Sequence, residues 1–181
     1  MADSSTTPQR SEQELQEILS KPAGPKDDQL LKDKEQAITQ LATLYRTNQD
    51  ATSLAQLVHS SRPLMEHLAK AKTAKLIRTL LDDFSAIPNA SKLQIQVTKD
   101  NIEWAKAEKR IFLKQSLETR LIALYIDTLA YKDALALINS LLRELKKLDD
   151  KMVLTEVHLL ESRVHHALSN MPKAKVCFRA L

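Results

Sequence analysis

The chain has 181 residues, of which 43% are hydrophobic and 28% charged, with a formal net charge of +4 and a single glycine. Loops that cradle phosphates or dinucleotides need several glycines at fixed offsets, so neither kind of nucleotide-dependent enzyme is expected. Tight β-turns also rely on glycine, and aromatic residues make up only 4% of the chain, so a β-rich fold is not expected either.

The composition also bounds location and partners. A single cysteine, Cys177, permits no internal disulfide, which is typical of a reducing compartment. The polar start MADSSTTPQR has no apolar signal region, and no apolar run is long enough to span a membrane. We therefore expect a cytoplasmic and nuclear protein with no membrane partner. Residues 62–147 are mildly basic, but acidic residues alternate with the basic ones and aromatics are few, so no nucleic-acid partner is expected.

Helical patterns follow one another along the chain. Ser11 and Glu14 have capping-box spacing at the start of a short amphipathic helix, and the break KPAGPKDD follows it. We predict that residues 1–25 are mostly disordered apart from this short helix, and that residues 26–181 form one helical domain. Within that domain, Pro63 ends one helix or begins the next. The other predicted helices cover about 28–47, 50–60, 68–84, 90–109, 111–130, 131–149 and 151–169, and a further one begins in SNMPKAKVCFRAL.

The apolar residues of two adjacent helices have helical spacing. Leu135 and Leu142 widen the stripe of the first helix, which predicts packing against more than one neighbour. Connections of a few residues make consecutive helices antiparallel. The two stripes are Ala134, Ile138, Leu141, Leu145 and Leu148, and then Val153, Val157, Leu160, Val164 and Ala167.

A weak internal repeat supports an array of helical hairpins. The segment YKDALALI begins at Tyr131 and aligns with MPKAKVCF at Met171, an offset of 40 residues, and a similar entry occurs near Asn48. This period is longer than that of a strict tetratricopeptide repeat. We therefore predict an all-α fold, a right-handed α-solenoid of irregular tetratricopeptide-like helical hairpins. At its end, Val176, Phe178 and Leu181 are expected to lack a covering hairpin.

The candidate chemical sites are sparse. His158, Glu161 and His165 lie on one helical face, but a metal site needs further ligands, so no metal or other cofactor is predicted. Cys177 lacks an acid–base partner at a diagnostic spacing and is interpreted as a half-buried structural residue. Trp104 is interpreted as a buried anchor between hairpins. No catalytic constellation is present, so an enzyme is not expected.

One charged surface is the candidate partner site. On a helical wheel Lys72, Lys75 and Arg78 fall together, opposite the apolar side of the same helix. Three cations on one face suit an acidic partner, although a solvated helix surface is the alternative, and Asp82 lies four residues after Arg78.

Several motifs resemble a known family. IEWAKAEKR, LLRELKKLDDK, LLESRVHHALSN and PKAK, supported by RPLMEHLAKAKTAKLIRTLLDDF, are similar to non-ATPase regulatory subunit 11 of the 26S proteasome lid, over about residues 30 to 176. The resemblance implies a non-catalytic scaffold subunit in ubiquitin-dependent degradation. It also implies that in such a subunit the N-terminal α-solenoid braces the lid against the core particle α ring and an ATPase subunit of the base. A PCI domain then joins other lid subunits.

The resemblance covers only the solenoid part of such a subunit. The PCI domain is absent from this sequence, so we expect the 181-residue chain alone not to enter the lid. The alternative function is a free-standing helical-repeat adaptor that binds a peptide or a partner helix in a concave groove.

Overall fold

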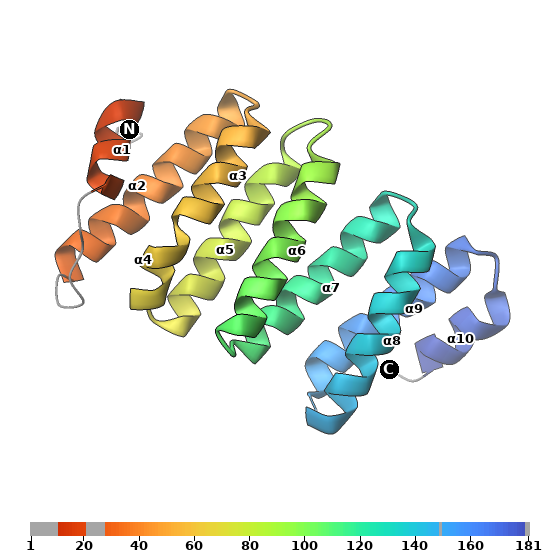
Figure 1. Ribbon diagram of the computed structural model, residues 1–181. Helices are drawn as coiled ribbons and strands as arrows, with labels where there is room; N and C mark the ends of the chain where they lie inside the picture. Colours follow the sequence, from red (N-terminus) through yellow and green to blue (C-terminus); the bar gives the residue numbers. More distant parts are fainter. Residues whose placement is uncertain (1–10, 21–27, 149, 180–181) are drawn as a thin grey trace, which may run out of the picture. The chain divides into compact units, whose positions relative to one another are not determined.

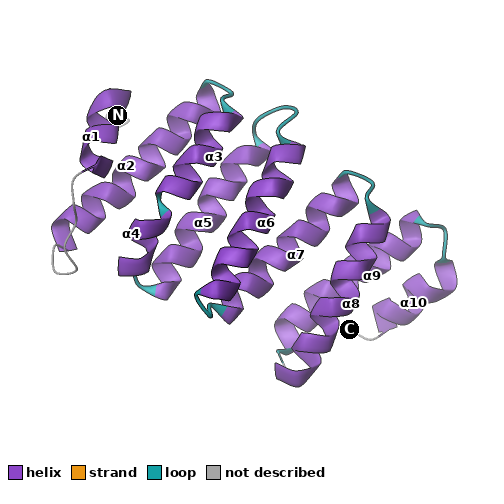
Figure 2. Ribbon diagram, in the orientation of Figure 1, coloured by secondary structure: helices purple, strands orange, loops and turns teal. Residues whose placement is uncertain are grey.

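The computed structural model describes residues 11–20, 28–148 and 150–179, and all regular structure within them is helical (Figure 2). The predicted all-α fold is thus confirmed. These residues fall into two compact units, which meet in sequence between Gln94 and Ile95. The helices are α1 (Glu12–Ser20), α2 (Asp28–Thr47), α3 (Ala51–Ser60), α4 (Arg62–His67), α5 (Lys70–Ser85), α6 (Ser91–Ala107), α7 (Ile111–Asp127), α8 (Tyr131–Leu148), α9 (Lys151–Ala167) and α10 (Met171–Arg179).

The first unit begins with the predicted short helix. The amide of Ser11 donates to Glu14 Oε2 at 3.0 Å and the amide of Glu14 to Ser11 Oγ at 3.4 Å, so the capping box is confirmed. Leu15 is 2% exposed, because α1 packs on α2. The predicted boundary between residues 25 and 26 lies outside the described residues.

Helices α2, α3 and α5 lie side by side in the first unit (Figure 1). α3 and α4 together are about as long as α6 or α9, but they are interrupted at Ser61. Pro63 lies in the first turn of α4, where its missing amide hydrogen costs nothing, so of the two predicted roles it begins the next helix. Leu68 then turns the chain with extended backbone, and Thr73 Oγ1 donates back to the Met65 carbonyl at 3.2 Å.

The second unit repeats the pattern. α7, α8 and α9 each pack on the next helix in the chain, and α7 also packs on α9. Because a helix contacts both its successor and the helix after that, each hairpin buries its apolar face on a neighbour, as in a helical-repeat protein. The handedness of the solenoid stays a prediction.

Most of the predicted stripes form the core. Ala134, Ile138 and Leu145 are fully buried, as are Val157 and Val164. The stripe of α8 nevertheless stops early, because Leu148, its last member, is 52% exposed. Val176 and Phe178 are 65% and 63% exposed, which fits the prediction of an uncovered face, whereas Leu181 lies outside the described residues.

Four turns between helices share one hydrogen-bond pattern. In the first, the amide of Asp50 donates to the Tyr45 carbonyl at 2.9 Å and that of Gln49 to the Arg46 carbonyl at 3.2 Å. This is a Schellman motif, which satisfies carbonyls that the helix end leaves unpaired. The Asp50 carbonyl already accepts from Leu54, so the residue that closes α2 also opens α3. The same bonds close the turns at Lys109–Arg110, Leu129–Ala130 and Ser169–Asn170.

These turns place the left-handed backbone conformation on residues other than glycine. Positive φ angles of 54° to 61° occur at Gln49, Lys109, Leu129 and Ser169 in these four turns and also at Asn89, just before α6. Consecutive positions in this series are 20 or 40 residues apart, and a helix begins just after each. The 40-residue offset predicted from Tyr131 and Met171 is therefore the length of one helical hairpin.

Leu129→Gly is expected to stabilise the chain. A non-glycine residue in this conformation costs roughly 1–2 kcal/mol, and the extra freedom of glycine in the unfolded chain returns about 0.4–1 kcal/mol of that. The free energy of unfolding in urea should therefore rise by up to about 1 kcal/mol. Ala136→Gly, at an exposed position in the interior of α8, is the control and should cost about 1 kcal/mol. Equal losses in both variants would contradict the assigned conformation.

Leu141→Ala tests the core of the second unit. Leu141 is 1% exposed, and its loss should lower the free energy of unfolding by about 2–5 kcal/mol. Leu148→Ala, on the same helix but half exposed, should cost less than about 1 kcal/mol. Urea unfolding followed by circular dichroism measures both, and similar losses would show that the buried face is wrongly placed.

Candidate interaction surfaces

The predicted basic face lies on α5 in the first unit. Lys72, Lys75 and Arg78 are all exposed, as predicted. The helix has this orientation because its apolar residues face α2 and α3. The buried residues of α5 are Thr73, Leu76, Ile77, Leu80, Leu81, Asp83 and Phe84.

The electrostatics of α5 are unfavourable at its first turn. Lys70 and Lys72 lie there, no acidic residue accompanies them, and the N-cap residue Ala69 gives no side-chain hydrogen bond. The amino end of a helix carries partial positive charge, so cations at this end are destabilising. By contrast, α3 begins at Asp50, whose carboxylate accepts from Thr52 and Ser53. The hydroxyls of Ser53 and Thr52 lower the Asp50 pKa to about 2.

Asp83 of α5 points away from the basic face. It is 7% exposed, and Arg46 Nη1 of α2 lies 3.1 Å from Asp83 Oδ1. Burial raises the pKa of Asp83, and the attraction of Arg46 offsets this only in part. Asp82, which is exposed, is thus the acidic residue at the end of α5 that faces solvent.

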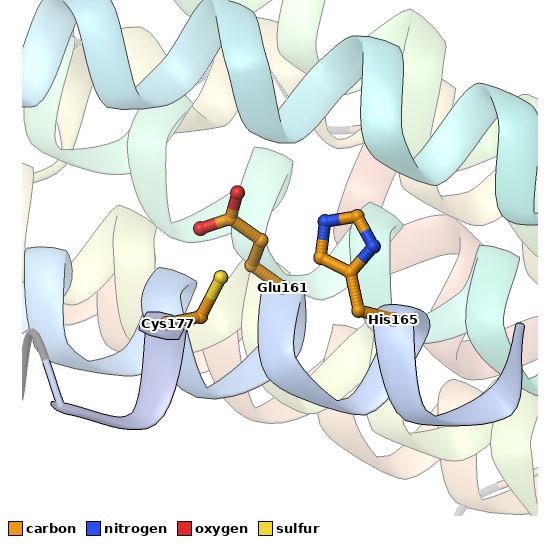
Figure 3. Close-up of side chains that lie close together, drawn as sticks. All are labelled: Glu161, His165 and Cys177. Atoms are coloured by element: carbon orange, nitrogen blue, oxygen red, sulfur yellow. The ribbon is translucent and has the colours of Figure 1, made fainter. Parts of the chain in front are cut away.

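A second candidate site joins α9 to α10. Glu161 and His165 of α9 face Cys177 of α10 (Figure 3), and one potential ligand atom from each lies within 4.8 Å of the others. His158 Nδ1 lies 3.1 Å from Glu161 Oε2. The sequence pattern had placed the two histidines and Glu161 on one face, but it gave no sign of Cys177, which the α9–α10 turn brings to them.

The thiol of Cys177 is protonated at neutral pH. Burial, and then a hydrogen bond to the Glu161 carboxylate, raise its pKa to about 11. Nucleophilic cysteines and metal-ligating cysteines act as thiolates, so these surroundings oppose both roles. The prediction of a structural cysteine agrees with this geometry, and Cys177 is 9% exposed.

A third polar group was not predicted at all. Lys114 of α7 binds Glu144 of α8 with its Nζ 2.7 Å and 2.9 Å from the two carboxylate oxygens, and Glu118 Oε1 lies 3.5 Å away. Burial raises the pKa of Glu118 more than Lys114 lowers it. In sequence these three charges look like any solvated helix surface.

Trp104, expected to be buried, is half-buried. The guanidinium of Arg110 lies 5.1 Å from the centre of its ring.

The side-chain groups described above do not by themselves identify a function. Comparison with known proteins identifies the family. Residues 2–128 match the family model described as the 26S proteasome regulatory subunit RPN6 N-terminal domain. The chain belongs to the Rpn6 family.

A search of the described residues for membrane-spanning helices found none with the necessary length and apolar character.

Individual relatives of this Rpn6-family chain agree. A Schizosaccharomyces pombe protein, named as a probable 26S proteasome regulatory subunit rpn6, is 53% identical over 164 residues, which are 91% of this chain and 39% of the relative. The Saccharomyces cerevisiae 26S proteasome regulatory subunit RPN6 is 45% identical over 154 residues, 85% of this chain and 36% of the relative. An Arabidopsis thaliana homolog of 26S proteasome non-ATPase regulatory subunit 11 is 40% identical over 166 residues, 92% of this chain and 39% of the relative. The chain thus spans about two fifths of their length.

The reactivity of Cys177 tests the α9–α10 contact. Its folded pKa of about 11 exceeds the ordinary value of 9.0, so the contact stabilises the fold below pH 9.0 and this contribution is lost as pH rises through 11. Alkylation of the single thiol should show an inflection near pH 11 in the folded chain and near pH 9 in urea. Glu161→Gln should lower the folded inflection but leave it above 9, because burial is the larger cause. Equal inflections in the folded and unfolded chain would contradict the contact.

Proposed function

We propose that this chain is the N-terminal part of a non-catalytic scaffold subunit of the 26S proteasome regulatory particle lid. In this role the helices brace the lid against the core particle α ring and an ATPase subunit of the base during ubiquitin-dependent protein degradation. Membership of the Rpn6 family is the observation that carries the proposal. The cytoplasm and the nucleus are the corresponding locations, and other lid subunits are further partners of the full-length protein.

The local chemistry is compatible with a scaffold. The polar clusters that link α2 to α5, α7 to α8 and α9 to α10 are ion pairs or hydrogen-bonded groups between packed helices, and the Cys177 thiol is held protonated. Such groups fix the packing of helices, whereas a scaffold acts through the surfaces that the packing exposes. A free-standing adaptor remains the second candidate, since helical hairpins serve both functions.

We propose Lys72, Lys75 and Arg78 as a contact with an acidic surface of the core particle or the base. Two observations support this. All three side chains are exposed, and one of them, Lys72, lies with Lys70 in the first turn of α5, where a positive charge is unfavourable for the helix itself. An acidic partner would relieve that cost.

Charge reversal tests the basic face. Purified core particle and base are each immobilised, and the association rate and affinity of the chain are measured at low and high salt. Lys72→Glu, Lys75→Glu and Arg78→Glu together should slow association about tenfold at low salt, and the loss should shrink at high salt because exposed charges are screened. The fold should be unaffected, since the three positions are exposed.

The control variant carries the same change in charge elsewhere. Lys92→Glu, Lys132→Glu and Lys175→Glu also replace exposed lysines and should leave association within about twofold of the original rate. Equal effects of the two triple variants would remove the basic face from the mechanism. A chain that binds neither core particle nor base, but does bind isolated peptides, would favour the adaptor.

A further inference from the structure

The second unit exposes large apolar side chains close together at one set of helix ends. Phe112 and Met152 are 79% and 82% exposed, and Ile111 and Leu148 are 51% and 52% exposed. They come from the start of α7, the end of α8 and the start of α9. Phe112 and Met152 are separated by one 40-residue hairpin, and α7 packs on α9. We call these four residues the apolar patch.

Two hollows adjoin at this patch. One, of about 480 Å³, is lined by Ile111, Phe112, Gln115, Leu148, Asp150, Lys151 and Met152. The other, of about 460 Å³, also reaches Ile111 and Leu148 and continues among Lys106, Lys109 and Lys147. Hollows of this size accommodate a few side chains of a binding partner. Isolated exposed apolar residues are ordinary, but a cluster beside hollows marks an interaction site.

The rim of the patch is cationic. Lys106, Lys109, Lys147 and Lys151 are exposed around it. The acidic groups that line the hollows are already engaged: Glu144 binds Lys114 at 2.7 Å, and Asp150 accepts from the Val153 amide at 3.3 Å as the N-cap of α9. Glu108 lies in the same turn as Lys109 but lines neither hollow. Lys106 Nζ lies 3.9 Å from Glu103 Oε2, so the excess of positive charge around the apolar centre rests on Lys109, Lys147 and Lys151.

A buried amide lies at the same place. Gln115 lines the first hollow and is 1% exposed, yet neither Nε2 nor Oε1 has a hydrogen-bond partner. Such an amide is unfavourable in the free chain. A bound polypeptide offers backbone N–H and C=O groups, which pair with both atoms once the side chain turns into the hollow.

We propose that the apolar patch binds an acidic segment of a partner protein that carries large apolar side chains. Lysines around the patch attract carboxylates, while Phe112 and Met152 cover the apolar side chains of the segment. A second copy of the chain is a poor occupant, because the same cations would face one another. Nucleic acid is also a poor fit, since the centre of the patch offers one aromatic ring and three aliphatic side chains.

This inference goes beyond the scaffold function, because it names a surface and the chemistry of its partner. The peptide-binding proposal and the scaffold proposal can be refuted independently, because the test below uses no proteasome particle. The folded 181-residue chain is immobilised and a display library of random 12-residue peptides is selected against it. The enriched sequences should carry net negative charge and at least two large apolar residues, and a synthetic peptide with the strongest such sequence then serves as the probe.

Variants locate the binding. The double variant Phe112→Ser with Met152→Ser should weaken binding of the probe at least tenfold. The double variant Lys109→Glu with Lys147→Glu should weaken binding equally, and the remaining binding should no longer depend on salt concentration. Leu129→Ser with Lys132→Glu is the matched control, because Leu129 is 69% exposed at the other end of α7, and it should bind as the original chain does. All changed positions are exposed, and circular dichroism checks that each variant folds.

Gln115→Leu separates structure from binding. It should raise the urea midpoint of the free chain and weaken binding of the probe several-fold, and undiminished binding would remove the amide from the site. The proposal as a whole is overturned if no peptide is enriched, if the enriched peptides are neutral or basic, or if the Phe112 and Met152 variant binds normally. It is also overturned if the chain binds single-stranded DNA or vesicles of an anionic lipid more tightly than the probe, and if that binding is lost in the Lys109 and Lys147 variant but not in the Phe112 and Met152 variant.

Discussion

Two nested hydrogen bonds at the end of a helix are the interaction on which the rest of this structure depends. They join the last turn of one helix to the residue just before the next, as at Tyr45 and Asp50, and leave no room for a longer loop. The turn needs a residue with positive φ, and in the described turns that residue is never glycine. The conformational cost at each turn is offset by the apolar face that the returning helix buries, so the turns and the core stabilise each other.

The spacing of these turns determines where the surfaces lie. Turns one hairpin apart bring equivalent positions of alternate helices together, and α7 and α9 are an example within the second unit. The apolar patch therefore combines residues 40 positions apart, Phe112 and Met152, without any motif that is continuous in sequence. Surfaces assembled in this way suit contacts with partner proteins, which agrees with the proposed scaffold function.

Sequence reasoning succeeded where one period dominates. Helix α2 was predicted with its observed bounds, Asp28 and Thr47, because the break KPAGPKDD precedes a long stretch with helical apolar spacing. The exposed side of α5 followed from the same periodicity. Leu148 was misassigned, since a helical wheel gives the direction of a side chain but not whether another helix covers it. The contact of Cys177 with Glu161 was missed as well, because it depends on how α10 returns along α9.

The central claim concerns the turns, and amide hydrogen exchange followed by NMR tests it most directly. The amides of Asp50, Arg110 and Ala130 donate the long bond of the motif, whereas the amides of Phe112 and Lys132, in the first turn of their helices, have no acceptor within the helix. We expect the three donors to exchange at least about 100-fold more slowly than the two first-turn amides, because release requires local opening of the hairpin. Exchange of the donors as fast as that of Phe112 and Lys132, while the helix interiors stay protected, would contradict the account.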